Sequence, residues 1–201
     1  MSRDFYIGGK WFVEHWRKGL LAAAKALYGR CFHQKVLIGS NWHFEFWRGD
    51  RIFAERVEEN ICPDAYINHV LDVVHSNGTK IYPWYLLLFS DDYTPVAADT
   101  YASPGFTEAT GYNETTRPQW GEDGVSNKAI SNESNKASYT MDGTDATIHG
   151  AAMVSLDTKG DTVGGGLLGP VIRFSQGPVT GIVAADVIKV WEEITGSDVA
   201  S

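Results

Sequence analysis

The chain has 201 residues, of which 43% are hydrophobic and 21% charged, and its formal net charge is −8. A chain of this length and hydrophobic content can bury a core in one domain, with or without an appended arm. The 21 glycines and seven tryptophans, with few long charged side chains, favour sheets and ordered turns and argue against a helical bundle.

The segment KWFVEHWRKGLLAAAKALYGR at 10–30 predicts an amphipathic helix. Its apolar stripe has helical spacing and consists of Phe12, Trp16, Leu20, Ala24, Leu27 and Tyr28. Two interpretations stand side by side. Either the stripe packs on the protein's own core, or Trp11 and Trp16 anchor this arm on another subunit.

Charge is unevenly distributed along the chain. Residues 1–40 carry seven basic and two acidic side chains, whereas residues 90–201 carry six basic and 16 acidic ones. The asymmetry suggests that the two ends face different surroundings. Because no nucleic-acid-binding motif accompanies the basic residues, nucleic acid is not expected as a partner.

The alternation in 43–47, preceded by the short apolar run 36–38 and followed by 51–57, predicts a hairpin. Its turn, Arg48-Gly49-Asp50, matches a cell-adhesion tripeptide, but a turn between two strands accounts for these residues without a receptor. A short helix is expected at 63–74, where Pro63 suits the first helical position and Tyr66, Val70 and Val73/Val74 form an apolar stripe.

From residue 80 onward the pattern changes to strands, expected at 81–89, 126–132, 136–141, 145–156, 170–175 and 183–194. Asp142-Gly143 predicts a hairpin between 136–141 and 145–156. The residues 90–124 form a long irregular region, which is expected to be an ordered loop.

These elements predict a mainly β fold with N-terminal helical elements (α+β), either an antiparallel β-sandwich or a flattened barrel. The expected division is an arm at 1–62, with the amphipathic helix and the hairpin, and a β-sandwich domain at 63–201.

No motif for catalysis or metal binding is found. The six histidines form no HxH, HxxxH or HExxH unit, and Cys31 and Cys62 are expected to be free thiols. The acidic pairs 91/92, 122/123, 142/145 and 157/161 lack the spacing of a calcium loop and are interpreted as acidic turns. We therefore expect no metal and no organic cofactor.

Two further patterns bear on location. The N-terminus has no secretory signal, and the longest apolar stretch, Trp84 to Phe89, is too short to span a bilayer. The expectation is a protein that is made and stays soluble in a cytoplasm, without a membrane partner.

The segment WYLLLFSDDYTPVAADTYA at 84–102 resembles a loose group of tailed-bacteriophage structural proteins, in which a strand precedes a T-x-x-x-A-x-D-T segment. The segments ASYTMDGTDATIHGAAMVSLDTKGD and VAADVIKVWEEI resemble the paired and closing strands of that group. In the closing pattern GD-x-L-x-V-x-x-x-I, Ala185 stands where the group has glycine. The likeness covers 63–195 and not the first 60 residues.

The resemblance implies a non-enzymatic component of a virion, made in the host cytoplasm and assembled with copies of itself and other phage structural proteins on the head, neck or tail. The residues expected at the assembly interface are the large apolar ones of the arm and the loop: Trp11, Phe12, Trp16, Leu20, Phe106, Tyr112 and Trp120. Two alternatives stay open, a carbohydrate- or receptor-binding β-module and a jelly-roll hydrolase.

Overall fold

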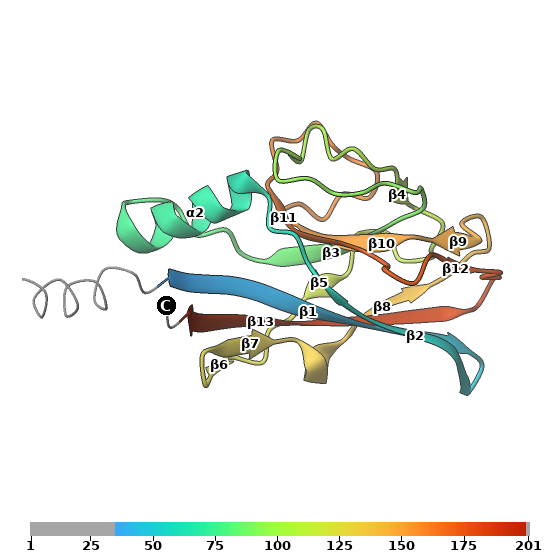
Figure 1. Ribbon diagram of the computed structural model, residues 1–201. Helices are drawn as coiled ribbons and strands as arrows, with labels where there is room; N and C mark the ends of the chain where they lie inside the picture. The colour runs from blue at the N-terminus through green and yellow to red at the C-terminus, as the bar shows by residue number, and fades with distance from the viewer. Residues whose placement is uncertain (1–34, 200–201) are drawn as a thin grey trace, which may run out of the picture. The chain divides into compact units, whose positions relative to one another are not determined.

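The computed structural model describes residues 35–199, of which 38–196 form one compact unit. This unit is mainly β, and all of its strand pairs are antiparallel. Its two larger sheets lie in two layers (Figure 1) and do not close into a barrel. The expected mainly β fold is therefore confirmed in its sandwich form. The helix expected at 10–30 lies outside the described residues.

The six-stranded sheet has the order β2-β1-β13-β7-β6, and β8 also pairs with β13. Its strands are β1 (Lys35–Arg48), β2 (Arg51–Glu59), β6 (Val125–Ser126), β7 (Ala129–Ser131), β8 (Ala137–Thr140) and β13 (Val187–Val199). The closing strand is thus an interior strand of this sheet. Along β13 the side chains of Ile188, Val190 and Glu192 are buried, and those between them are only partly buried. This is the alternation that a half-covered strand requires.

The five-stranded sheet has the order β11-β10-β3-β4, with β5 also paired to β3. Its strands are β3 (Trp84–Phe89), β4 (Glu108–Ala109), β5 (Gln119–Trp120), β10 (Gly150–Val154) and β11 (Leu168–Arg173). A third, two-stranded sheet joins β9 (Thr147–Ile148) to β12 (Val179–Thr180). The expected helix at 63–74 is observed as α2 (Asp64–His75), at one end of the layers in Figure 1, and a 3-10 turn spans Glu133–Asn135.

Both faces of β3 are buried, which explains its continuous apolar sequence. Leu86 and Leu88 belong to the core between the two larger sheets, together with residues of β1, β8, β10 and β13. Leu87 and Phe89 belong to a second cluster on the opposite face, which Tyr101 and Phe106 of the long loop also enter. The loop therefore covers the outer face of the five-stranded sheet.

The hairpin expected between 136–141 and 145–156 is wrong. Strand β8 pairs with β13, while β10 pairs with β3 and β11 in the other sheet. Asp142 accepts hydrogen bonds from the backbone N–H and the hydroxyl of Thr144, and the backbone of Met141 bonds to Asp186 and Ala185. These bonds make Asp142-Gly143 a corner between the layers.

Two other strand predictions need correction. The single strand expected at 126–132 is a short hairpin of β6 and β7, because Asn127 and Lys128 both have positive φ (51° and 64°), as the tightest hairpin turns require. The two runs 36–38 and 43–47 form one continuous strand, β1.

The expected boundary at residue 62 is also wrong, because the β1–β2 hairpin is part of the six-stranded sheet. The turn expected at Arg48-Gly49-Asp50 is confirmed, since Arg48 pairs with Arg51 across it. The guanidinium of Arg48 donates to both carboxylate oxygens of Asp186, at 2.9 and 2.7 Å. This arginine thus ties the hairpin to the start of β13.

Ala185 has φ +68°, a left-handed conformation that costs an alanine about 1–2 kcal/mol. This is the position where the phage pattern has glycine. We expect Ala185→Gly to raise the free energy of unfolding by about 0.5–1 kcal/mol, since glycine's extra unfolded-state entropy offsets part of the relief. Ala184→Gly is the control, because Ala184 has no positive φ and should only lose stability. Denaturant titration of both variants decides it, and an equal loss for both contradicts the prediction.

Candidate functional site

An open cavity of about 300 Å³ lies between helix α2, the segment before β3 and one end of the six-stranded sheet. Four aromatic residues line it: Tyr66, Tyr82, Trp84 and Trp120. The aliphatic part of its wall consists of Ile38, Val70, Ile81, Ile130, Met153 and Ile194, and the charged residues are Lys80 and Glu122. We call this cavity the aromatic groove.

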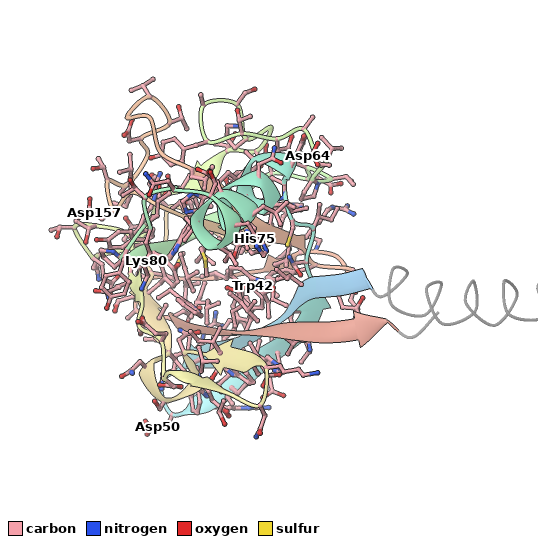
Figure 2. The ribbon with its side chains drawn as sticks, turned by 90° about the vertical axis from the view of Figure 1, so that its left-hand side faces the viewer. Trp42, Asp50, Asp64, His75, Lys80 and Asp157 are labelled. Atoms are coloured by element: carbon pink, nitrogen blue, oxygen red, sulfur yellow. The ribbon has the colours of Figure 1, made fainter. Side chains whose placement is uncertain are left out.

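The aromatic side chains hold one another in place. Tyr66 from α2 meets Trp84 edge to face, with ring centroids 5.8 Å apart, and Trp84 is the cross-strand partner of Trp120. The ammonium of Lys80 lies 5.0 Å from the centre of the Tyr82 ring. Figure 2 looks at this side of the molecule, with Asp64 and His75 marking the ends of α2 and Lys80 beyond it. The groove is thus formed by elements far apart in sequence.

The rim of the groove is open and apolar. Ile38 and Tyr82 retain 45% and 58% of their surface exposed, which is high for large apolar side chains beside a cavity. Inside, the indole N–H of Trp120 is buried and has no hydrogen-bond partner among the described residues. A buried donor without a partner is costly, so this indole lowers the stability of the wall.

Glu192 lies behind the groove and is fully buried. Burial raises the pKa of Glu192 to about 8, and nearby Ser40 and Trp42 oppose this shift. Neither carboxylate oxygen has a hydrogen bond of normal geometry within the described part of the chain, so burial prevails. Burial also raises the pKa values of Tyr66 and Cys62, and the neighbouring Glu192 adds to both shifts. At neutral pH the carboxyl group of Glu192 is therefore mostly protonated.

The described histidines lie apart. The His43 ring stacks on Trp191 with centroids 3.5 Å apart, and burial lowers the pKa of His43 while nearby Glu133 and Glu193 oppose that shift. His69 meets the edge of Trp84, and His149 lies 3.8 Å from Asp92. Between residues 35 and 199, no three His, Cys, Asp or Glu side chains are grouped to hold a metal ion.

The acidic pairs lie in loops, as expected, and at least one member of each of the four pairs accepts a hydrogen bond from the backbone. Backbone N–H groups donate to Asp91, Asp123, Asp142, Asp145 and Asp161, from Thr107, Ser134, Thr144, Gly111 and Val163 respectively. The distances are 2.6–2.9 Å. These carboxylates stabilise loop conformations and are not paired with one another across a cleft.

The expected interface residues divide into two groups. Trp11, Phe12, Trp16 and Leu20 lie outside the described residues. Phe106, Tyr112 and Trp120 are only 8%, 2% and 6% exposed, and they belong to the chain's own hydrophobic clusters. Their expected role at a subunit interface is therefore corrected, because these three side chains have almost no free surface.

The physical reason is packing within the chain: Phe106 lies on the outer face of the five-stranded sheet, whereas Tyr112 and Trp120 belong to the core between the two larger sheets. Phe106 stacks on Phe89 of β3 with centroids 4.7 Å apart, and Tyr112 meets Tyr139 of β8 edge to face at 5.1 Å. The loop recovers the entropy cost of its ordering inside its own chain. Among the three, only Trp120 also lines the aromatic groove.

Sequence reasoning did not assemble the groove, although it placed some of its parts. Tyr66 and Val70 were expected on the apolar face of a helix, and Trp84 in a strand. The missing step was the packing of that helix against the start of β3. Glu192 carried a readable signal, because it shares the inward face of the last strand with Ile188 and Val190.

Comparison of the chain with protein-family models, with curated proteins and with solved structures finds no match. Over residues 35–199 there is no helix with the length and apolar character needed to cross a membrane.

Proposed function

We propose that this chain is a non-enzymatic structural component of a tailed-phage virion, and that it assembles as a symmetric oligomer on the head, neck or tail. The observation that carries the assembly is the open, apolar aromatic groove on a β body whose two cores are otherwise filled. Apolar surface of this kind marks an interaction site.

The assignment to a virion rests on the resemblance in sequence, and two structural details support it. In the T-x-x-x-A-x-D-T segment, Asp99 is buried and accepts hydrogen bonds from the Tyr93 hydroxyl and the Val96 N–H, at 2.7 and 2.8 Å. In the closing pattern, Ala185 has the backbone conformation that its usual glycine favours. The aspartate of the first pattern and the glycine position of the second therefore each have a structural role in this fold.

A carbohydrate-binding module is the second candidate, because the exposed ring of Tyr82 offers a surface on which a sugar can stack. The aliphatic wall of the groove supports it less, since sugar hydroxyls need many polar partners and the polar groups of the lining are few: the charged ends of Lys80 and Glu122 and the hydroxyls of Tyr66 and Tyr82. Isothermal titration with a panel of oligosaccharides distinguishes the two candidates.

Light scattering over a range of concentrations tests the assembly. The expected result is one discrete species whose mass is a multiple of 22.2 kDa, and a mass of 22.2 kDa at every concentration contradicts it. An antibody against the chain should label particles purified from a producing host. Particles that lack the chain would show that it is not a virion component.

A further inference from the structure

The aromatic groove has the chemistry of a receptor for apolar side chains. Its wall is mainly aliphatic and aromatic, its rim residues Ile38 and Tyr82 are exposed, and Lys80 and Glu122 are the charged residues in its lining. Covering such a rim stabilises a complex by roughly 25 cal/mol per Å² of apolar surface removed from water. The occupant must therefore present large apolar groups.

The sequence of this chain contains a segment of that chemistry. Residues 10–30 place Phe12, Trp16 and Leu20 on one side of an expected helix, which would be about 30 Å long. Helices of this kind bind apolar grooves through anchors spaced three and four residues apart. Trp and Phe are also the side chains that most often supply binding energy at interfaces.

Charge favours the same pairing. Residues 38–196 carry ten basic and 22 acidic side chains, whereas residues 1–37 carry seven basic and two acidic ones. Lys18 and Lys25 lie off the apolar stripe, where they remain available to the acidic surface of a partner. Complementary charge of this kind raises the association rate and fixes the orientation of a complex.

The connection between the segment and the sheet favours a second copy as the source. Strand β1 begins at Lys35, and Ile38 already lines the groove. A segment that returned to the groove of its own chain would have to reverse direction between Gly29 and Lys35. Beyond Gly29 this link, Arg-Cys-Phe-His-Gln, includes none of the usual turn formers.

We infer that the aromatic groove binds the amphipathic segment 10–30 of a second copy of this chain. The inference rests on the proposed function, because it specifies the contact through which the copies assemble. Phe12 and Trp16, which are four residues apart on the apolar stripe, are the expected anchors.

Three full-length variants test the contact. The arm variant is Phe12→Ala/Trp16→Ala, and the groove variant is Ile38→Ser/Tyr82→Ser. The control is Leu71→Ser/Val74→Ser, which removes two apolar residues of α2 that are 52% and 66% exposed and do not line the groove. Thermal unfolding first confirms that each variant folds. If the double arm variant does not fold, Trp16→Ala replaces it, and if the double groove variant does not fold, Tyr82→Ser replaces it.

Sedimentation of the separate variants gives the first result. We expect the dissociation constant of the oligomer to rise about a thousandfold in the arm variant and at least tenfold in the groove variant. The control should assemble as the wild type does. A groove variant that assembles normally, or a control that is equally weakened, would overturn the inference.

Mixing the arm and groove variants gives the second result. One variant retains an intact groove and the other an intact segment, so the mixture should form a 1:1 complex that neither variant forms alone. If each variant is dissociated alone and the two form no complex on mixing, the segment does not bind the groove of a second copy. If the wild-type chain is monomeric, the proposed function is overturned as well. If the wild type is oligomeric and the groove variant assembles equally well, only this inference is overturned.

Discussion

Replacing Arg117 with alanine is expected to lower the free energy of unfolding by about 3–5 kcal/mol, because the change leaves a buried carboxylate without its counterion. The side chains of Arg117 and its partner Glu108 are only 1% and 7% exposed. For a protein of this size such a loss is a large fraction of the total stability. Denaturant titration of Arg117→Ala measures it directly.

The strength of this expectation comes from the number of bonds that Arg117 makes. Its five N–H donors all have acceptors: both oxygens of Glu108 at 2.9 and 2.7 Å, the Tyr101 hydroxyl at 2.9 Å, and the carbonyls of Leu156 and Asp161 at 2.9 and 2.8 Å. Burial acts to lower the pKa of Arg117, but the bonds to Glu108 and Tyr101 outweigh it and raise the pKa. The guanidinium is charged at every accessible pH.

A matched control lies on the surface. Arg173 pairs with Asp92, and both side chains are substantially exposed, so Arg173→Ala should cost no more than about 1 kcal/mol. The double variant Arg117→Met/Glu108→Gln should lose less than the sum of its two single variants, because it leaves no unpaired buried charge. If Arg117→Ala costs no more than Arg173→Ala, the network does not hold the loop.

The contacts of Arg117 also show which parts of the fold can be predicted from the sequence and which cannot. The periodicity of 2 in 183–194 and the helical stripe in 63–74 depend on neighbours in sequence, and both elements are observed as β13 and α2. The order of the long loop depends on contacts from Arg117 to Glu108, Leu156 and Asp161, up to 44 residues away. Such contacts leave no local pattern.

The same limit applies to strand pairing and to the candidate site. The sequence Asp142-Gly143 is compatible with a hairpin, and what prevents one is the pairing of β8 with the distant strand β13. The aromatic groove likewise combines α2, β3 and β5 with the ends of β1 and β13. The composition shows that the chain has many aromatic residues, but it does not predict which of them lie together. The order of the strands and the packing of α2 bring Tyr66, Trp84 and Trp120 into one cavity.

The second large effect concerns Glu192, whose carboxyl group is fully buried on the interior strand β13. Burial raises its pKa from an ordinary 4.5 to about 8. Its backbone N–H donates to the buried side chain of Asn132 at 2.8 Å, which fixes the strand at this point. The carboxyl group is therefore held inside the core rather than turned toward water.

The sign of the pH dependence follows from proton binding in the two states. Between about pH 4.5 and pH 8 the native protein keeps the proton on Glu192, whereas the unfolded chain releases it. Since the native state binds more protons, the free energy of unfolding falls as the pH rises through this window. The slope is about 1.4 kcal/mol per pH unit, and it vanishes below pH 4.5 and above pH 8.

Glu192→Gln removes the titrating proton and keeps the size of the side chain. We expect its stability relative to the wild type to increase with pH between 5 and 8, by about 1.4 kcal/mol per unit, and to be constant below pH 4.5. Other titrating groups contribute equally to both proteins and cancel in the difference.

Glu192→Leu separates charge from hydrogen bonding, because it also lacks the titrating proton and should show the same slope with a different offset. Denaturant titrations of the three proteins at pH 4 to 9 measure these differences. Differences that do not change with pH would mean that Glu192 is ionised in the native core. Ser40 and Trp42 would then have to stabilise the charge, although neither forms a hydrogen bond of normal geometry with its oxygens.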